Sequence, residues 1–152
     1  MSVFRTMMMI RLTDMPEPTP SVDEPAVTAA ILMVEDNVDV RVMGETLLVD
    51  AGFVVHTARD AAEALAMMEA GLGFDLLFTD IVMPGDLDGV GLAAEVARLR
   101  PGTPILLTTG WADRAEDQAK QRPELELIAK PYRQTDLLRK IRLLLDRGAA
   151  GI

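Results

Sequence analysis

Groups that can take part in phosphate chemistry follow four separate apolar runs of the sequence. They are three carboxylates, one hydroxyl and one ammonium, on Glu35, Asp36, Asp80, Thr109 and Lys130. Where such runs are parallel strands, their carboxyl ends meet along one edge of the sheet, which is where open α/β sheets bind ligands. We therefore expect these five side chains to converge, although they come from distant parts of the chain.

The chemistry of these groups favours a divalent cation and a phosphoryl group. Adjacent carboxylates repel one another unless a cation neutralises them, and Mg²⁺ prefers such hard oxygen ligands. The chain has no cysteine and one histidine, so it offers no zinc cluster. An Asp carboxylate can attack phosphorus to give an acyl phosphate, with a metal and a cation such as Lys130 offsetting the charge. The hydroxyl of Thr109 can hydrogen-bond a phosphoryl oxygen.

Short apolar runs alternate with segments of helical period along most of the chain. The predicted strands are Ala30–Val34, Val54–Thr57, Phe74–Thr79, Pro104–Thr108 and Leu125–Ala129. The predicted helices are Val38–Ala51, Ala61–Ala70, Gly91–Arg100, Asp113–Arg122 and Asp136–Arg147. This alternation is typical of βαβ units with a parallel sheet covered on both faces. It predicts an α/β fold in which five βα units form a doubly wound, flavodoxin-like, five-stranded parallel sheet.

Composition and charge limit the classes of function. Hydrophobic residues make up 49% of the chain and charged residues 26%, which is typical of a globular protein with a sizeable core. The net charge is −9 and the basic residues are scattered, so we expect no direct binding to nucleic acid. The absence of cysteine fits a reducing, cytoplasmic setting.

The ends of the chain differ from its middle. Residues 1–27 form a Pro-rich N-terminal extension that we expect to be flexible, and their apolar stretch is too short and too interrupted by arginine to insert in a membrane. We expect the domain to span residues 28–147. A C-terminal tail, 148–152, follows it and is too short for an output domain, so we expect a stand-alone module.

Four motifs in order resemble the receiver domain of two-component response regulators. They are ILMVED (31–36), LLFTDIVMPG (76–85), PILLTTG (104–110) and KPY (130–132), and the resemblance extends from Ala29 to about Leu145. It implies that Asp80 is the phosphoacceptor. It also implies a Mg²⁺ site formed by Glu35, Asp36, Asp80 and the backbone carbonyl of Val82.

The resemblance implies further roles around Asp80. Lys130 would pair with the phosphoryl group, and the peptide bond between Lys130 and Pro131 would be cis. Thr109 would be the switch hydroxyl because it lies five residues after Pro104, with Thr108 as the last residue of the preceding strand. The phosphodonor would be a phosphohistidine on a sensor histidine kinase or a phosphotransfer protein. Output would pass through contact with a downstream protein or through a phosphorelay.

The sequence departs from the family pattern in the region that transmits the switch. Leu127 stands where receivers often have an aromatic residue, three positions before Lys130. We hypothesise that Trp111 and the weak helix after it take over this part of the switch. Pro123 and the small number of apolar residues indicate that this helix is short or mobile.

Other readings of the same residues remain open. A phosphohydrolase of the haloacid-dehalogenase type also uses an Asp nucleophile and Mg²⁺, but it has a second acid two residues later, where this chain has Val82. A receiver-like interaction module that never meets phosphate is the other alternative. Gly89–Ala94 matches a dinucleotide fingerprint, but the motif does not follow a strand directly, which counts against that site. His56 lacks acidic or thiol neighbours at ligand spacing, so we expect no catalytic role for it.

Overall fold

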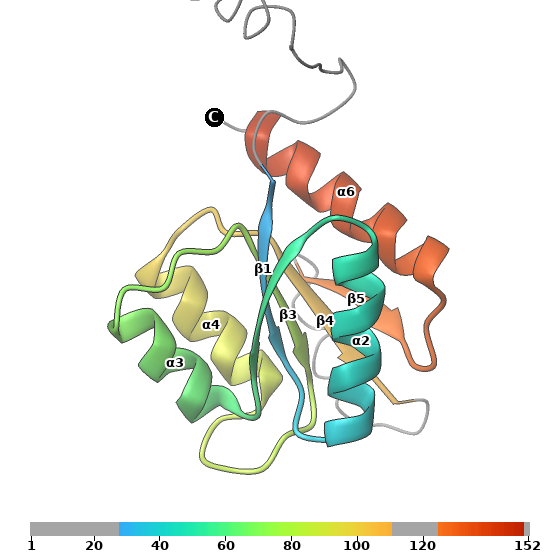
Figure 1. Cartoon of the computed structure of the whole chain (residues 1–152). Helices are drawn as coiled ribbons and strands as arrows, with labels where there is room; N and C mark the ends of the chain where they lie inside the picture. Colours follow the sequence, from blue (N-terminus) through green and yellow to red (C-terminus); the bar gives the residue numbers. More distant parts are fainter. Residues whose placement is uncertain (1–27, 111–124, 151–152) are drawn as a thin grey trace, which may run out of the picture.

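The computed structural model describes residues 28–110 and 125–150, of which 148–150 are described by their backbone alone (Figure 1). Its strands are β1 (Ala30–Val34), β2 (Val54–Ala58), β3 (Leu76–Asp80), β4 (Ile105–Thr109) and β5 (Glu126–Ala129). Its helices are α2 (Val38–Asp50), α3 (Ala61–Glu69), α4 (Gly89–Leu99) and α6 (Gln134–Ala150). The predictions for the N-terminal extension, for Trp111 and for a helix at Asp113–Arg122 lie outside the described residues.

All the strand pairs of the sheet are parallel, in the order β2-β1-β3-β4-β5. Helices α3 and α4 cover one face of the sheet, and α2 and α6 cover the other (Figure 1). The two faces therefore have separate apolar layers, and the inner strands are buried on both sides, as their continuous apolar runs predict. The predicted five-stranded, doubly wound α/β fold is confirmed.

Side-chain caps start three of the helices at the edge where the strands end. Asn37, Asp60 and Asp88 each accept a hydrogen bond from a backbone N–H in the first turn of α2, α3 and α4. Such caps satisfy N–H groups that have no partner inside the helix. Asn37 and Asp60 follow β1 and β2 within three residues, so these two caps determine where the chain turns away from the sheet.

The prediction that Thr108 ends its strand is wrong, since β4 continues to Thr109. Thr109 lies opposite Ala129 of β5, and its carbonyl accepts a hydrogen bond from the N–H of Lys130 at 2.9 Å. Asp80 is likewise the last residue of β3 and lies opposite Thr108. Pairing with the neighbouring strand extends both strands by one residue, which a single apolar run does not reveal.

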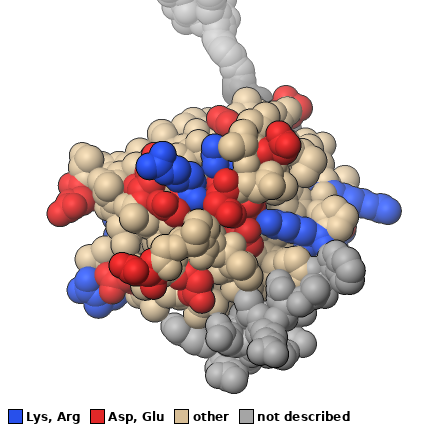
Figure 2. All heavy atoms as spheres, turned by 90° about the horizontal axis from the view of Figure 1, so that it is seen from below, with Lys and Arg blue, Asp and Glu red and all other residues tan. Residues whose placement is uncertain are grey.

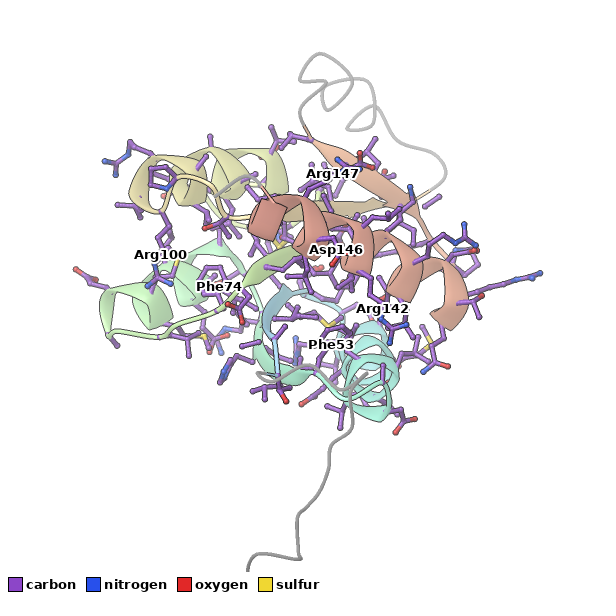
Figure 3. The ribbon with its side chains drawn as sticks, turned by 90° about the horizontal axis from the view of Figure 1, so that it is seen from above. Phe53, Phe74, Arg100, Arg142, Asp146 and Arg147 are labelled. Carbon is purple, nitrogen blue, oxygen red and sulfur yellow. The ribbon has the colours of Figure 1, made fainter. Side chains whose placement is uncertain are left out.

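At the other end of the sheet, where the strands begin, Arg100 links three segments of the chain (Figure 3). The guanidinium of Arg100 lies 4.9 Å from the centre of the Phe74 ring, a cation–π contact. The same side chain donates a hydrogen bond to the carbonyl of Met68 at 3.5 Å. This contact ties the chain after α4 to the end of α3 and to the segment before β3, at the edge away from the carboxylates.

Candidate functional site

Three carboxylates meet at the edge where the strands end. One oxygen from each of Glu35, Asp36 and Asp80 lies within 4.8 Å of the others. Glu35 is 2% exposed and Asp80 6% exposed, whereas Asp36 is exposed to solvent. Figure 2 views the molecule from this side and shows acidic side chains gathered near the middle of the face, with basic ones beside them. The predicted convergence of these acids from β1 and β3 is therefore observed.

Lys130 lies between two of these carboxylates. Its Nζ is 3.0 Å from Oδ2 of Asp80 and 2.9 Å from Oε1 of Glu35. Burial acts to lower the pKa of Lys130, but the hydrogen bonds to Glu35 and Asp80 outweigh it and raise the pKa. The ammonium therefore stays charged and is shared by two acids. The peptide bond between Lys130 and Pro131 is cis, as the resemblance implied.

Backbone groups surround Asp80 closely. The N–H of Val82 donates to Oδ1 of Asp80 at 3.4 Å. A Cβ at Gly89 would collide with the backbone carbonyl of Asp80, so α4 can begin this close to β3 only with a glycine there. The glycines that match a dinucleotide fingerprint, a reading that the sequence counts against, are thus in the first turn of α4, which packs against the phosphoacceptor candidate.

Glu35 is held from several directions. The N–H of Asn37 donates to Oε2 of Glu35 at 3.1 Å, and Nη1 of Arg41 donates to the carbonyl of Glu35 at 2.7 Å. Burial raises the pKa of Glu35, while the hydrogen bonds from Lys130 and Asn37 oppose the rise. The sequence reasoning missed Arg41, whose position six residues after Glu35 on a predicted helix was the only signal.

Thr109 lies at the end of β4 and is buried. Its hydroxyl donates to the carbonyl of Gly110 at 3.0 Å. Leu127 of β5 packs against the apolar layer under α3 and α4. The role of Thr109 as the switch hydroxyl stays a prediction, as does the replacement of the usual aromatic, absent at Leu127, by another part of the chain.

A sequence profile of the response regulator receiver domain matches residues 31–142 of the chain. The chain belongs to this family. The receiver is 33% identical to the protein PetR of Rhodobacter capsulatus over 118 residues, which cover 77% of the chain and 48% of PetR. It is also 33% identical to the response regulator receiver protein CpdR of Brucella abortus over 116 residues, which cover 76% of the chain and 95% of CpdR.

A solved structure has the same fold as the receiver. The CheY-like receiver domain protein of Methanospirillum hungatei superposes with a TM-score of 0.74 at 30% identity, covering 83% of this chain and all of that one. The receiver thus spans about half of PetR and nearly all of CpdR. Within the described part of the receiver, no helix is long and apolar enough to cross a membrane.

The carboxylate cluster of the receiver fits a Mg²⁺ ion. It offers hard oxygen donors from two strand ends, two buried and one exposed, and the exposed Asp36 leaves one side open to the water molecules that Mg²⁺ retains. A single lysine against three acids leaves the cluster negatively charged. A divalent cation would compensate that charge.

Tyr132 is a residue of the site region that the sequence reasoning did not single out. It is 8% exposed, and its ring meets that of Phe78 edge to face with centroids 5.6 Å apart. Burial raises the pKa of Tyr132 to about 12, and the negative charge of Glu35 adds to the rise. The KPY motif was its signal, but the position in the motif does not reveal that the hydroxyl is buried.

The titration of Tyr132 gives a direct check of this environment, since the chain has one tyrosine. We expect ultraviolet absorbance to report a midpoint near 12 rather than 10. The free energy of unfolding should fall as the pH rises from about 10 through about 12, because the folded state retains the phenol proton that the unfolded chain releases. A midpoint at 10 in the folded receiver, verified by circular dichroism, would contradict the buried hydroxyl.

Proposed function

We propose that the receiver is a cytoplasmic phosphoacceptor switch that takes a phosphoryl group onto Asp80 in a Mg²⁺-dependent reaction. The donor is a phosphohistidine on a sensor histidine kinase or a phosphotransfer protein. One observation carries the proposal: the ammonium of Lys130 lies 3.0 Å from a carboxylate oxygen of Asp80, inside a cluster of three acids. This arrangement joins a nucleophile, a fixed cation and a set of metal ligands.

The transfer needs little covalent chemistry from the receiver. A carboxylate oxygen of Asp80 forms a bond to phosphorus while the bond from phosphorus to the histidine nitrogen breaks, and its electron pair returns to the imidazole. Lys130 offsets charge on the transferring group. Mg²⁺, when held by Glu35, Asp36, Asp80 and the carbonyl of Val82, would neutralise the phosphoryl oxygens.

After transfer, Asp80 carries a doubly charged group in a crowded, mostly buried place. The hydroxyl of Thr109 is the proposed sensor of that group, through a hydrogen bond to a phosphoryl oxygen. Output then passes by contact with a downstream protein or by phosphorelay. Because Leu127 replaces the usual aromatic, the change must reach the surface by another route, for which Trp111 is our candidate.

Mg²⁺-dependent labelling separates this proposal from its rivals. Incubation with labelled acetyl phosphate should give about one acid-stable, base-labile phosphoryl group per chain, and EDTA should prevent it. Sustained hydrolysis of phosphomonoesters would favour a phosphohydrolase, against which Val82 already counts. The absence of any label with Mg²⁺ present would favour a module that does not use phosphate.

Exposed apolar side chains border the carboxylates and are suited to docking of the phosphodonor. Val38 and Val42 of α2 are 58% and 54% exposed, and Val82 after β3 is 56% exposed. Val38 follows the Glu35–Asn37 turn directly, so these side chains lie beside the acids. A donor protein must cover these exposed side chains to bring its phosphohistidine to Asp80.

We expect the double substitution Val38→Asp and Val42→Asp to slow phosphotransfer from the cognate kinase by at least about tenfold, because charge enters an apolar contact. Labelling by acetyl phosphate should change less than twofold. The control is Val49→Asp, which is on the same helix and 51% exposed but about three turns farther from the acids than Val38. Equal losses with kinase and acetyl phosphate would indicate damage to the site rather than to docking.

A further inference from the structure

Two hydroxyls are buried on the α2 and α6 side of the sheet without a hydrogen-bond partner among the described residues. They belong to Tyr132, which is 8% exposed, and Thr108, which is 3% exposed. Leaving a buried donor unpaired has a substantial cost, and such groups in native proteins call for a reason. Tyr132 is the more informative of the two because of where its hydroxyl lies.

The hydroxyl of Tyr132 lies next to α2. It is close to Gly44 of α2, where a Cβ would come within 2.8 Å of the oxygen, and the side chain of Met33 adjoins the same point. Met33 is in β1 and Glu35 directly follows the strand, with its N–H still paired to the carbonyl of Ala58. Because side chains alternate along a strand, those of Met33 and Glu35 face the same side of the sheet. The negative charge of Glu35 also contributes to the raised pKa of the Tyr132 phenol. The contact with Met33 therefore places the hydroxyl on the side of the sheet that Glu35 faces.

Glu35 depends on a cation that it shares. Lys130 lies 2.9 Å from Glu35 and 3.0 Å from Asp80. A phosphoryl group on Asp80 adds negative charge and attracts Lys130 more strongly than the carboxylate did. Glu35 is nearly fully buried. Even with Mg²⁺ on the cluster, the Glu35 oxygen that Lys130 leaves needs another hydrogen-bond donor, because an unsatisfied buried acceptor has a substantial cost.

We infer that Tyr132 is a positioning residue whose hydroxyl donates a hydrogen bond to the Glu35 carboxylate when Lys130 turns to the phosphoryl group. This inference rests on the proposed function, because it assigns a second state to the same site. In that state the phenol holds Glu35 in place while Lys130 acts on the phosphoryl group. The unpaired hydroxyl of the first state is then the cost of keeping that donor available.

The single tyrosine makes the hydrogen bond observable. Tyrosine labelled with ¹³C at Cζ gives one signal from the whole chain, and that signal moves when the hydroxyl donates to a carboxylate. In the full chain we expect it to shift on addition of Mg²⁺ and beryllofluoride, a mimic of the phosphoryl group. If calorimetry shows that the mimic binds and the signal does not shift, this inference is overturned, but the proposed function is not.

A second arm needs no phosphate chemistry. In Lys130→Met without Mg²⁺ or mimic, Glu35 has lost its ammonium, so the tyrosine signal should already be shifted. In Lys130→Met combined with Glu35→Leu the acceptor is gone, and the shift should disappear. A chain that binds no beryllofluoride refutes the proposed function, and the inference about phosphorylation falls with it. The Lys130→Met experiment then still decides whether the phenol can donate a hydrogen bond to the carboxylate of Glu35.

The energetic consequence is measured with Tyr132→Phe. We expect this variant to bind beryllofluoride about tenfold more weakly in Mg²⁺, because it lacks a hydrogen bond to a charged group that forms only in the bound state. Its thermal midpoint without mimic should be unchanged or higher, since a buried unpaired hydroxyl is removed. Thr108→Val, which removes the other unpaired hydroxyl, is the matched control and should change the affinity less than twofold. Equal effects of the two substitutions, or no effect of Tyr132→Phe, would contradict the role of Tyr132.

Discussion

Asp80→Asn is expected to abolish phosphoryl labelling of the receiver by acetyl phosphate and by a kinase. The amide that replaces the carboxylate has no oxygen able to form a stable acyl phosphate. The substitution conserves shape, and the carbonyl oxygen of Asn can keep the hydrogen bond from the N–H of Val82. The variant should therefore remain folded, with a loss of label of more than a hundredfold. Intact mass before and after treatment with base or hydroxylamine measures the label directly.

The control for Asp80→Asn is Asp86→Asn, which removes an exposed acid from the same edge of the molecule. This control should be labelled at the rate of the unmodified receiver. The neighbouring acid Asp36 is the alternative phosphoacceptor, and its substitution gives the result that would most clearly contradict the assignment to Asp80. Labelling that persists in Asp80→Asn and disappears in Asp36→Asn would move the phosphoacceptor from β3 to the end of β1.

Lys130→Met has the second largest expected effect, on both rate and stability. The rate of labelling at saturating Mg²⁺ should fall by roughly 10²–10³, as is typical when one fixed positive donor to a transition-state charge is removed. Without Mg²⁺ the free energy of unfolding at neutral pH should fall by roughly 2–4 kcal/mol, because the buried carboxyl groups of Glu35 and Asp80 lose the ammonium that they share. The side chain of Lys130 is 22% exposed, which limits the loss.

The pH dependence distinguishes a lost cation from a packing defect. Burial already raises the pKa of Glu35 above 4.5, and removing Lys130 removes the main opposing hydrogen bond. A raised pKa in the folded state means that stability is present below the unfolded value and is lost as the pH rises through the folded value. The deficit of Lys130→Met should therefore shrink as urea denaturation is repeated at lower pH, from 7 towards 4.5.

The control for Lys130→Met is Lys140→Met, whose Nζ lies 3.9 Å from a carboxylate oxygen of Glu126 on a more exposed surface. This substitution should cost less than about 1 kcal/mol and leave labelling unchanged. A pH-independent deficit in Lys130→Met would indicate that the aliphatic part of the lysine, rather than its charge, stabilises the site.

Local patterns in the chain predicted most of the architecture. The apolar run from Ala30 to Val34 was predicted at its observed bounds, because a strand buried on both faces consists of continuous apolar residues. Helix ends were less accurate: α4 begins at Gly89 rather than Gly91, and α6 at Gln134 rather than Asp136. For α4, the cap formed by Asp88 sets the start, and no apolar periodicity marks a cap.

The amino-acid sequence by itself determined which chemistry is available and at which edge it collects. Acids, a hydroxyl and a lysine follow strands that must run parallel, and parallel strands bring their ends together. Only the tertiary structure decided that Lys130 lies between Glu35 and Asp80. It also decided that Gly89 packs on the carbonyl of Asp80 and that the Tyr132 hydroxyl is buried against α2. These contacts join residues far apart in the sequence, and they depend on strand register and helix packing at the scale of single ångströms. Residue type and spacing do not encode such distances, because the packing of the whole domain sets them.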